Sequence, residues 1–180
     1  MTEGFRVVGE RVVYTGHVIS LAVATVEAPD GTHLQRDVVH HPGAVAVVAV
    51  EDGHAILVRQ YRAAIDGWLL EVVAGKRDVA DEELELTAQR ELNEEVGLHA
   101  DSLELLARFH NSPGFCDELL FVYLATDLSE VPMHRDGVEE HAMTIERVPL
   151  DDVPLLIASG ELRDAKTIIG LTLARERLGA

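Results

Sequence analysis

Residues 90–98 constrain this chain more than any other segment, because they read Arg-Glu-Leu-Asn-Glu-Glu-Val-Gly-Leu within a pattern that predicts an amphipathic helix. In a helix, Glu91 and Glu95 project from one face, with Glu94 close by and Arg90 one turn before Glu94. Like charges at this spacing repel, so helix stability does not explain them. A solvated surface is the ordinary explanation of a charged helix face. Converging carboxylates are also what Mg²⁺ or Mn²⁺ requires, so the segment is a candidate metal site.

The residues before this segment have an ordered spacing as well. Gly75 lies seven residues before Glu82, which lies eight residues before Arg90, and an apolar, strand-like run precedes the glycine. Together these positions closely resemble the signature of the Nudix hydrolase family. The matching residues are Gly75, Glu82, Arg90, Glu91, Leu92, Glu94, Glu95, Gly97 and Leu98. From Glu82 onward, every position of the signature matches.

The sequence departs from the usual signature in the loop after Gly75. This loop, residues 76–81, is one residue longer than usual. Either the loop carries an extra residue, or Asp81 takes the place of the first glutamate. We favour the extra loop residue, because loops absorb insertions and a helix face does not. A second departure is Val73, where relatives of the ADP-ribose type often carry proline, and we expect function to survive it.

Length and composition fit one compact enzyme domain. The 180 residues are near the usual size of a single domain, and the single cysteine, Cys116, excludes a disulfide framework and a cysteine-based zinc site. The apolar runs are too short to cross a bilayer and the first residues lack the layout of a signal peptide, so we expect a soluble cytoplasmic protein. The net charge of -17 argues against nucleic acid as a partner, because such binding relies on lysine and arginine.

The order of expected elements indicates an α/β fold. Turn sequences at Pro29-Asp30-Gly31 and Glu51-Asp52-Gly53 predict two hairpins, and Gly97 is a plausible helix stop. The expected strands span residues 17–27, 33–41, 44–50, 55–61, 68–73, 103–110, 119–125 and 144–148, and the expected helices span residues 83–96, 151–159 and 165–178. This order fits an α/β/α sandwich around a mixed β-sheet, which the Nudix resemblance also implies. We expect residues 1–42 to form an N-terminal antiparallel strand region and residues 43–180 the Nudix domain.

Short strings outside the signature are similar to those of ADP-ribose pyrophosphatases. They are Arg59-Gln60-Tyr61-Arg62, Ser112-Pro113-Gly114-Phe115, Asp117-Glu118, Glu139-Glu140 and Asp164-Ala165-Lys166-Thr167. The resemblance implies Mg²⁺-dependent hydrolysis, with Mn²⁺ as a possible substitute, of ADP-ribose to AMP and ribose 5-phosphate. One alternative is another nucleoside diphosphate-linked substrate, such as a nucleotide sugar, a dinucleotide or an oxidised nucleotide. The other is a sensor that binds ADP-ribose without turnover, although sensors usually lose signature carboxylates that this chain keeps.

The resemblance and the helix geometry together give the expected metal ligands. Glu91 and Glu95 are the first candidates, and Glu94 contributes directly or through water. By resemblance, the backbone carbonyl of Ala74 completes one metal site. Arg90 orients the carboxylates, because a guanidinium can bind two of them through its fork of donors. Glu82 ligates an additional ion or holds the loop.

The general base is expected outside the signature helix. By resemblance it is a glutamate on a mobile loop before the last strand, and here residues 128–143 contain both Gly137 and acidic residues. We favour Glu140 over Glu139. The neighbouring His141 is an alternative, since its unperturbed pKa lies near neutrality.

Substrate contacts are expected from five residues. Arg36 and Arg62 are candidates for the diphosphate or the terminal ribose. Phe115 is a candidate for the wall of the adenine or ribose pocket, and so is Tyr61. Glu71 resembles a glutamate that binds the adenine amino group or supports the metal. The resemblance also implies a homodimer that exchanges N-terminal strands, so that Arg36 reaches the partner's site.

Overall fold

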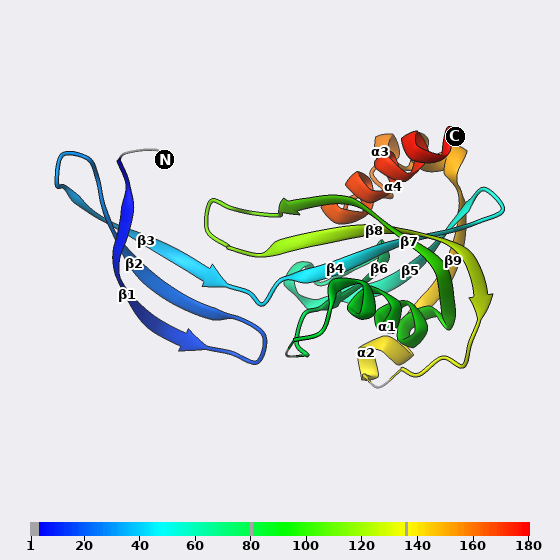
Figure 1. Cartoon of the computed structure of the whole chain (residues 1–180), viewed down its shortest axis with the longest axis horizontal. Helices are drawn as coiled ribbons and strands as arrows, with labels where there is room; N and C mark the ends of the chain where they lie inside the picture. The colour runs from blue at the N-terminus through cyan, green and yellow to red at the C-terminus, as the bar shows by residue number, and fades with distance from the viewer. Residues whose placement is uncertain (1–3, 80, 136) are drawn as a thin grey trace. The chain divides into compact units, whose positions relative to one another are not determined.

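The computed structural model describes residues 4–79, 81–135 and 137–180 and divides the chain into two compact units. Residues 4–43 together with His110–Leu119 form the first unit, which we call the N-terminal unit. Ala44–Phe109 and Leu120–Ala180 form the second, which we call the core unit. The elements of both are labelled in Figure 1.

The N-terminal unit is built on a three-stranded antiparallel sheet in the order β1-β2-β3. The strands are β1 (Arg6–Thr15), β2 (Ser20–Glu27) and β3 (His33–His40). The sequence pattern predicts β2 and β3 but no strand before residue 17. Two register shifts interrupt β1, between Val7 and Gly9 and between Val12 and Tyr14. Such bulges break the alternation on which strand prediction depends, which explains why β1 escaped it.

The core unit contains a six-stranded mixed sheet in the order β7-β8-β4-β6-β5-β9. β4 and β8 are parallel, while β4–β6, β5–β6 and β5–β9 are antiparallel. The strands are β4 (Ala44–Glu51), β5 (His54–Arg62), β6 (Gly67–Lys76), β7 (Leu98–His110), β8 (Leu119–Glu130) and β9 (Thr144–Pro149). The helices are α1 (Leu84–Val96), α2 (Val138–His141), α3 (Val153–Ser159) and α4 (Ala165–Leu178), and short 3-10 turns span Ala63–Ile65 and Leu150–Asp152.

Helices cover both faces of this sheet, which confirms the expected α/β class. On one face, Val48 of β4 packs in a cluster with Leu171 of α4. On the other face, Val47 packs in a cluster with Leu92 of α1. Because β4 is buried on both sides, it carries a continuous apolar run instead of an alternating one.

The central sheet also sets the position of the candidate site. Pairing between β4 and β6 places Val45 opposite Gly75, so the end of β6 is held by the middle of the sheet. α1 follows β6 through a loop and packs against both strands. In the described residues, no helix is long and apolar enough to cross a membrane.

Candidate active site

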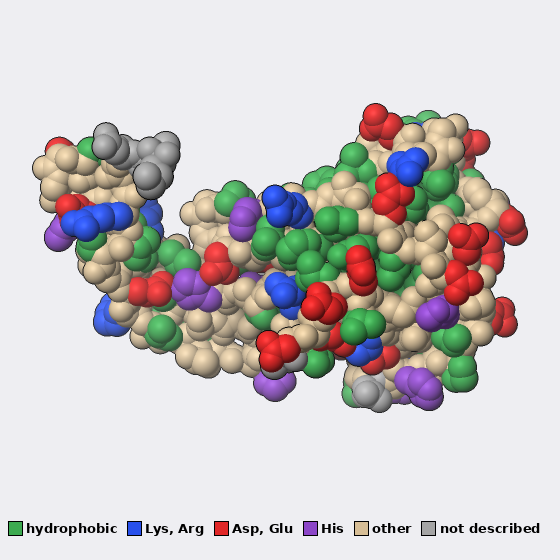
Figure 2. All heavy atoms as spheres, in the orientation of Figure 1, with side chains coloured by type: hydrophobic (Ala, Val, Ile, Leu, Met, Phe, Trp, Pro, Cys, Tyr) green, Lys and Arg blue, Asp and Glu red, His purple; other side chains and the backbone are tan. Residues whose placement is uncertain are grey.

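α1 brings the signature residues to the end of β6. Its apolar face buries Ala88 and Leu92, which fixes the rotation of the helix against the sheet. The helix ends at Gly97, which has a left-handed backbone with φ of 67°. Arg90, Glu91 and Glu94 are therefore presented on one side of a helix whose ends and rotation are both fixed. Figure 2 shows acidic and basic side chains close together around this part of the surface.

Gly75 lies directly against the carboxylate of Glu91. A β-carbon built on Gly75 would overlap the carboxyl group of Glu91, at a distance that no two non-bonded atoms adopt. Glycine is required here because the backbone of β6 and the Glu91 side chain approach too closely for any other residue. The backbone N–H of the preceding residue, Ala74, donates a hydrogen bond to the Glu95 carboxylate and opposes the rise of its pKa. The structure thus brings Ala74, Glu91 and Glu95 together, as the sequence predicts.

Arg90 connects three carboxylates of the signature. Its Nη1 donates to Glu91 Oε1 at 2.7 Å and to Glu94 Oε2 at 3.1 Å. Its Nε and Nη2 donate to the two carboxylate oxygens of Glu82 at 3.3 and 3.2 Å. Glu82 therefore takes the position of the first glutamate, and Asp81 lies in the loop with φ of 60°. This geometry supports an extra loop residue and an orienting role for Arg90.

Two of these carboxyl groups are buried where a negative charge is unfavourable. Burial, followed by the charge of Glu91, raises the pKa of Glu95 to about 8. Burial also raises the pKa of Glu91 to about 7, although Arg90 opposes the shift. Among the described residues, Glu95 Oε2 is buried without a hydrogen-bond partner. A nearby cation would favour the ionised forms of both groups.

The donor set fits a hard divalent cation. Such an ion prefers oxygen ligands, and the site combines the carboxylates of Glu91, Glu94 and Glu95 with the backbone of Ala74. In the parts of the chain that the structure describes, no three acidic, histidine or cysteine side chains form a ready-made ion site. The Glu91 and Glu94 carboxylates bind Arg90 instead, so some of their contacts would have to change when an ion binds.

The loop with the candidate base reaches this helix. The charge of Glu140 contributes to the raised pKa of Glu95, whereas the charge of Glu139 acts on Tyr61. The two neighbouring glutamates therefore differ in the group on which their charge acts, and Glu140 is the one that acts on a carboxylate of α1. His141 Nδ1 lies 2.7 Å from the carbonyl of Gly137, so one ring nitrogen serves the local turn.

Arg135 ties the same loop to α1, and sequence reasoning missed it. Its Nε and Nη2 donate to the carbonyl oxygen of Glu95 at 2.9 and 2.7 Å, and its Nη1 donates to that of Met143 at 2.9 Å. A cation at the C-terminus of a helix is favourable because the last carbonyls lack partners within the helix. Arg135 and Glu95 are 40 positions apart in the sequence. The one sequence signal for their contact is that a basic residue follows the glycine at which the helix ends.

Arg62 and Glu71 form a bidentate pair beside this region. Arg62 Nε and Nη2 donate to the two oxygens of Glu71 at 2.8 and 2.7 Å. The hydrogen bonds to Glu71 are the largest cause of the raised pKa of Arg62, and the charge of Glu95 makes a smaller contribution, so the guanidinium lies within electrostatic range of α1. The Glu71 side chain is completely buried, whereas that of Arg62 is 41% exposed. Arg62 is thus open to a ligand, and Glu71 is placed to act through it.

Arg36 and Phe115 belong to the N-terminal unit. Arg36 lies on β3 and donates from Nη1 to the carbonyl of Gln35 at 2.7 Å. Phe115 is exposed, and its backbone carbonyl accepts a hydrogen bond from the N–H of Val39 at 2.7 Å. The roles of both residues in substrate binding stay predictions.

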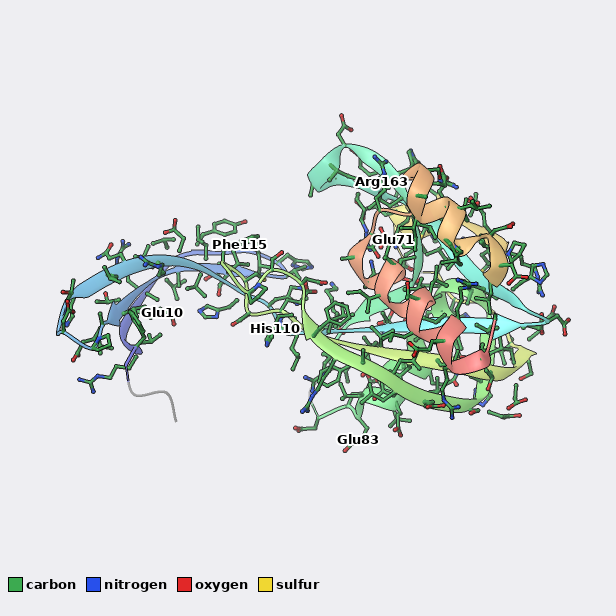
Figure 3. All side chains as sticks on the ribbon, turned by 90° about the horizontal axis from the view of Figure 1, so that it is seen from above. Glu10, Glu71, Glu83, His110, Phe115 and Arg163 are labelled. Carbon is green, nitrogen blue, oxygen red and sulfur yellow. The ribbon has the colours of Figure 1, made fainter. Side chains whose placement is uncertain are left out.

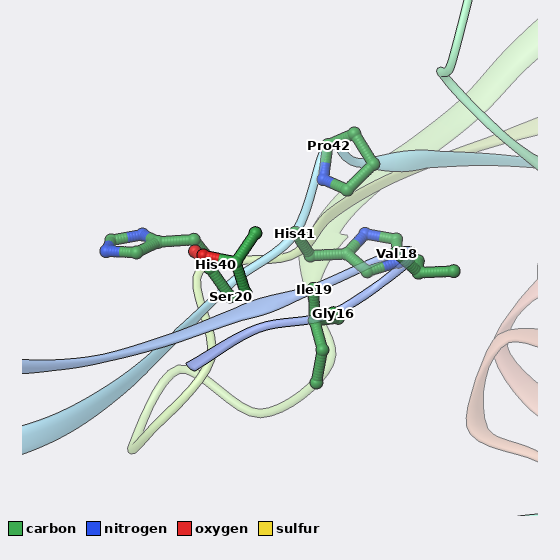
Figure 4. A pocket seen from close by; sticks show the side chains of 8 residues that line it. Gly16, Val18, Ile19, Ser20, His40, His41 and Pro42 are labelled. Carbon is green, nitrogen blue, oxygen red and sulfur yellow. The ribbon is translucent and has the colours of Figure 1, made fainter. Parts of the chain in front are cut away.

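The N-terminal unit also contains a hollow of about 310 Å³ next to His40 and His41. The two rings point in opposite directions (Figure 4). His40 lies between two carboxylates, with Nδ1 2.6 Å from Asp117 and Nε2 2.7 Å from Glu10. His40 of β3 thus bridges Glu10 of β1 and Asp117 of the 110–119 segment.

The sequence model of the NUDIX domain matches residues 39–169, which include the whole α1 site. The chain belongs to the Nudix family.

Two relatives of this Nudix protein are similar over most of their length. The ADP-ribose pyrophosphatase of Bacillus subtilis (strain 168) is 41% identical over 163 residues, which cover 90% of this chain and 88% of that protein. The ADP-ribose pyrophosphatase of Mycobacterium tuberculosis (strain ATCC 25618 / H37Rv) is 39% identical over 168 residues, which cover 93% of this chain and 81% of that protein. They confirm the predicted Nudix hydrolase family and its ADP-ribose pyrophosphatase-like subgroup.

A solved structure supports the Nudix fold independently. The crystal structure of an ADP compounds hydrolase superposes with a TM-score of 0.86 at 24% identity, covering 98% of this chain and 95% of that one. At this identity the similarity concerns the fold. Together with the mixed sheet and its flanking helices, it confirms the expected architecture.

Proposed function

We propose that this Nudix hydrolase cleaves ADP-ribose with water to AMP and ribose 5-phosphate, using Mg²⁺. The observation that carries the hydrolytic part is the close approach of Gly75 to Glu91, with Arg90 and Glu95 beside it. The choice of ADP-ribose is supported by the names of the two relatives at 41% and 39% identity. A cytoplasmic location remains a prediction from the sequence.

Glu91, Glu95 and Glu94 would hold the ion, together with the carbonyl oxygen of Ala74. When bound, the ion supplies charge neutralisation on the phosphate oxygens and lowers the pKa of a bound water. Arg90 holds Glu91 and Glu94 in place from its position between them. Its contacts with Glu82 keep the guanidinium on the loop side of the helix. Arg90 and Glu94 thus contribute to catalysis through the arrangement of the carboxylates.

Glu140 is the proposed general base. It accepts the proton of the attacking water, and its electrostatic effect on Glu95 supports a position near the reacting phosphate. Glu139 acts on Tyr61 instead, which makes it the weaker candidate. A Glu140→Gln protein with normal turnover would remove this role from Glu140.

Arg62 is the proposed contact for the diphosphate or terminal ribose, because its guanidinium is partly exposed and within electrostatic range of Glu95 on α1. Arg36 and Phe115 are proposed to contribute from the N-terminal unit. We further propose a homodimer, because β1 exposes several large apolar side chains that a second chain would cover. They include Val7, Val12 and Tyr14. A monomer in solution with full activity would refute the dimer.

The decisive experiment is phosphate-coupled turnover of ADP-ribose with Mg²⁺, beside nucleotide sugars, dinucleotides and nucleoside triphosphates. Glu95→Gln is the test variant, and Glu85→Gln is its matched control on the exposed side of α1. We expect ADP-ribose to be preferred and its turnover to be lost only in Glu95→Gln. Preference for another compound would retain the metal site and replace the substrate. Tight binding of ADP-ribose without turnover would instead indicate a sensor.

A further inference from the structure

Arg62 belongs to a largely buried cluster of four charged side chains. Glu71 is completely buried and Lys166 has a side chain only 9% exposed, and the two are joined by an ion pair between Lys166 Nζ and Glu71 Oε2. Lys166 Nζ also lies 3.0 Å from Asp164 Oδ2. Arg62 binds the same Glu71 carboxylate from the other side. The cluster is Arg62, Glu71, Asp164 and Lys166, and we call it the Glu71 cluster.

The cluster is fixed where α4 begins. Figure 3 shows Glu71 beside this end of α4. Asp164 is the N-cap residue of α4, and its Oδ2 accepts hydrogen bonds from the backbone N–H of Thr167 at 3.0 Å and from its hydroxyl at 2.6 Å. Thr167 Oγ1 in turn accepts a hydrogen bond from the N–H of Val72 at 2.9 Å. Asp164 therefore has a position set by the helix and by β6.

The charges within the cluster are balanced, with two acidic and two basic side chains. Buried charges require such pairing, because an uncompensated charge in the interior is strongly unfavourable. Arg62 is the most exposed of the four, at 41%, compared with 18% for Asp164 and 9% for Lys166. Its Nε and Nη2 bind Glu71, which leaves the Nη1 edge for a further acceptor.

We propose that Lys166 is a positioning residue: by pairing with Glu71 and Asp164 inside the protein, it keeps Arg62 extended toward the site and available to the phosphates of the substrate. This inference rests on the proposed function, because it assumes that Arg62 binds an anionic substrate. It adds a residue that touches neither the substrate nor the metal ligands.

The physical reason is competition for one guanidinium. Without Lys166, the carboxylates of Glu71 and Asp164 would share Arg62 as the single cation of the cluster. The pKa of Arg62 is raised mainly by its hydrogen bonds to Glu71, but the charge of Asp164 contributes too, so Asp164 already attracts this side chain. Loss of Lys166 therefore draws Arg62 inward, away from a substrate.

The test compares three variants in steady-state kinetics with ADP-ribose. Lys166→Met keeps an unbranched side chain and removes the charge, so KM should rise about tenfold with kcat nearly unchanged, the pattern of lost uniform binding. Lys166→Arg keeps the charge and should recover most of the affinity. Asp164→Asn with Lys166→Met restores one acid to one base, and asparagine remains a good N-cap, so KM should return toward the wild-type value.

A purely structural role gives the opposite pattern. The double variant would then be worse than Lys166→Met, and kcat and the unfolding midpoint would fall together, which would overturn the proposal. Asp164→Asn alone keeps the test decisive if Lys166→Met does not fold. This change should leave KM equal or lower, because one competitor for Arg62 is removed, and a raised KM would contradict it. Arg147→Met, which breaks an exposed pair with Glu51, is the control for loss of an ion pair.

An NMR measurement on the protein without substrate tests the role of Lys166 independently of whether ADP-ribose is the substrate. The Nε–Hε resonance of Arg62, assigned with Arg62→Lys, reports the hydrogen bond to Glu71 in a two-dimensional NMR spectrum. It should shift in Lys166→Met and return in the double variant, whichever compound the enzyme hydrolyses. An unchanged resonance in Lys166→Met would overturn the positioning role even if ADP-ribose is the substrate. If the Arg62 resonance shifts as expected but the enzyme does not hydrolyse ADP-ribose, only the choice of substrate is refuted.

Discussion

Gly75 and Glu91 share a space that holds only one side chain. The Glu91 carboxylate lies where a β-carbon of residue 75 would be, so the two positions are coupled although 16 residues separate them. The glycine gives the carboxylate access to the backbone of β6, where Ala74 contacts Glu95. This relationship links the glycine near the end of β6 to the proposed ion site by geometry.

The first prediction concerns this shared space. Gly75→Ala should displace the Glu91 carboxylate and lower kcat/KM by about 100-fold or more, because displacement of a reacting group by one ångström is that costly. Turnover and Mg²⁺ half-saturation measure the effect. Gly67→Ala is the control on the same strand, since its β-carbon would meet nothing nearer than 3.6 Å. Equal activity of the two variants would contradict the coupling.

Arg90→Gln should weaken metal binding without unfolding the protein. Arg90 holds Glu91 and Glu94 at 2.7 and 3.1 Å, and its removal leaves the carboxylates to repel one another. We expect the Mg²⁺ concentration for half-maximal activity to rise about tenfold, with activity partly recovered at saturating Mg²⁺. A titration of activity against Mg²⁺, with circular dichroism as the check on folding, tests this. Full activity at limiting Mg²⁺ would remove the orienting role.

The stability of the ion-free protein should fall as pH rises toward 8. Burial raises the pKa of Glu95 to about 8 and that of Glu91 to about 7, so the folded state binds protons that the unfolded state releases near the ordinary value of 4.5. The associated stability is complete below about pH 4.5 and is lost as pH rises through 7 and 8. Thermal unfolding in a chelator measures the decline.

Divalent cations should reverse this decline, because they bind the ionised carboxylates of the folded state. Mg²⁺ should therefore raise the unfolding midpoint more at pH 8.5 than at pH 5. Glu95→Gln, which cannot ionise, should flatten the pH dependence and weaken the response to Mg²⁺. A decline equally steep in Glu95→Gln would show that other groups cause it.

Much of this site was predictable because the pattern is local. Glu91, Glu95 and Arg90 lie within six residues, and helical periodicity places Glu91 and Glu95 on one face of α1 and Arg90 one turn before Glu94. Gly75, which precedes the loop, was found from its spacing to Glu82. Such arguments succeed where a short segment determines the geometry.

Other contacts were not predictable, because their partners are distant in sequence and lack a pattern. Arg135 binds backbone carbonyl oxygens, which every residue has, so no side chain in the sequence marks its partners. Lys166 meets Glu71 across 95 residues through the packing of α4 on β6. The burial of Glu71 follows from the same packing, whereas its sequence position alone suggested a contact with the adenine amino group or support of the metal.

Arg135→Gln should loosen the loop that carries Glu140. The guanidinium joins the carbonyl of Glu95 to that of Met143, and glutamine is too short to make all three hydrogen bonds. We expect faster amide hydrogen exchange in residues 137–143 and kcat lowered about tenfold, since one hydrogen bond to a charged group contributes about 1.5–3 kcal/mol. Arg177→Gln, which loses only an exposed pair with Glu104, should change neither quantity.

The His40 bridge makes a separate prediction for the N-terminal unit. Hydrogen bonds to Asp117 and then to Glu10 raise the pKa of His40 above 6.5, because both carboxylates favour the charged ring. The stabilising contribution of the bridge is therefore complete below pH 6.5 and is lost as pH rises through the higher pKa of the folded state. NMR titration of the His40 ring should show this raised value, and Asp117→Asn should lower it more than Glu10→Gln does. Since Asp117 lies in the 110–119 segment and Glu10 in β1, hydrogen exchange in both should increase together at alkaline pH. An unshifted pKa, or exchange that changes in one segment alone, would show that His40 does not couple them.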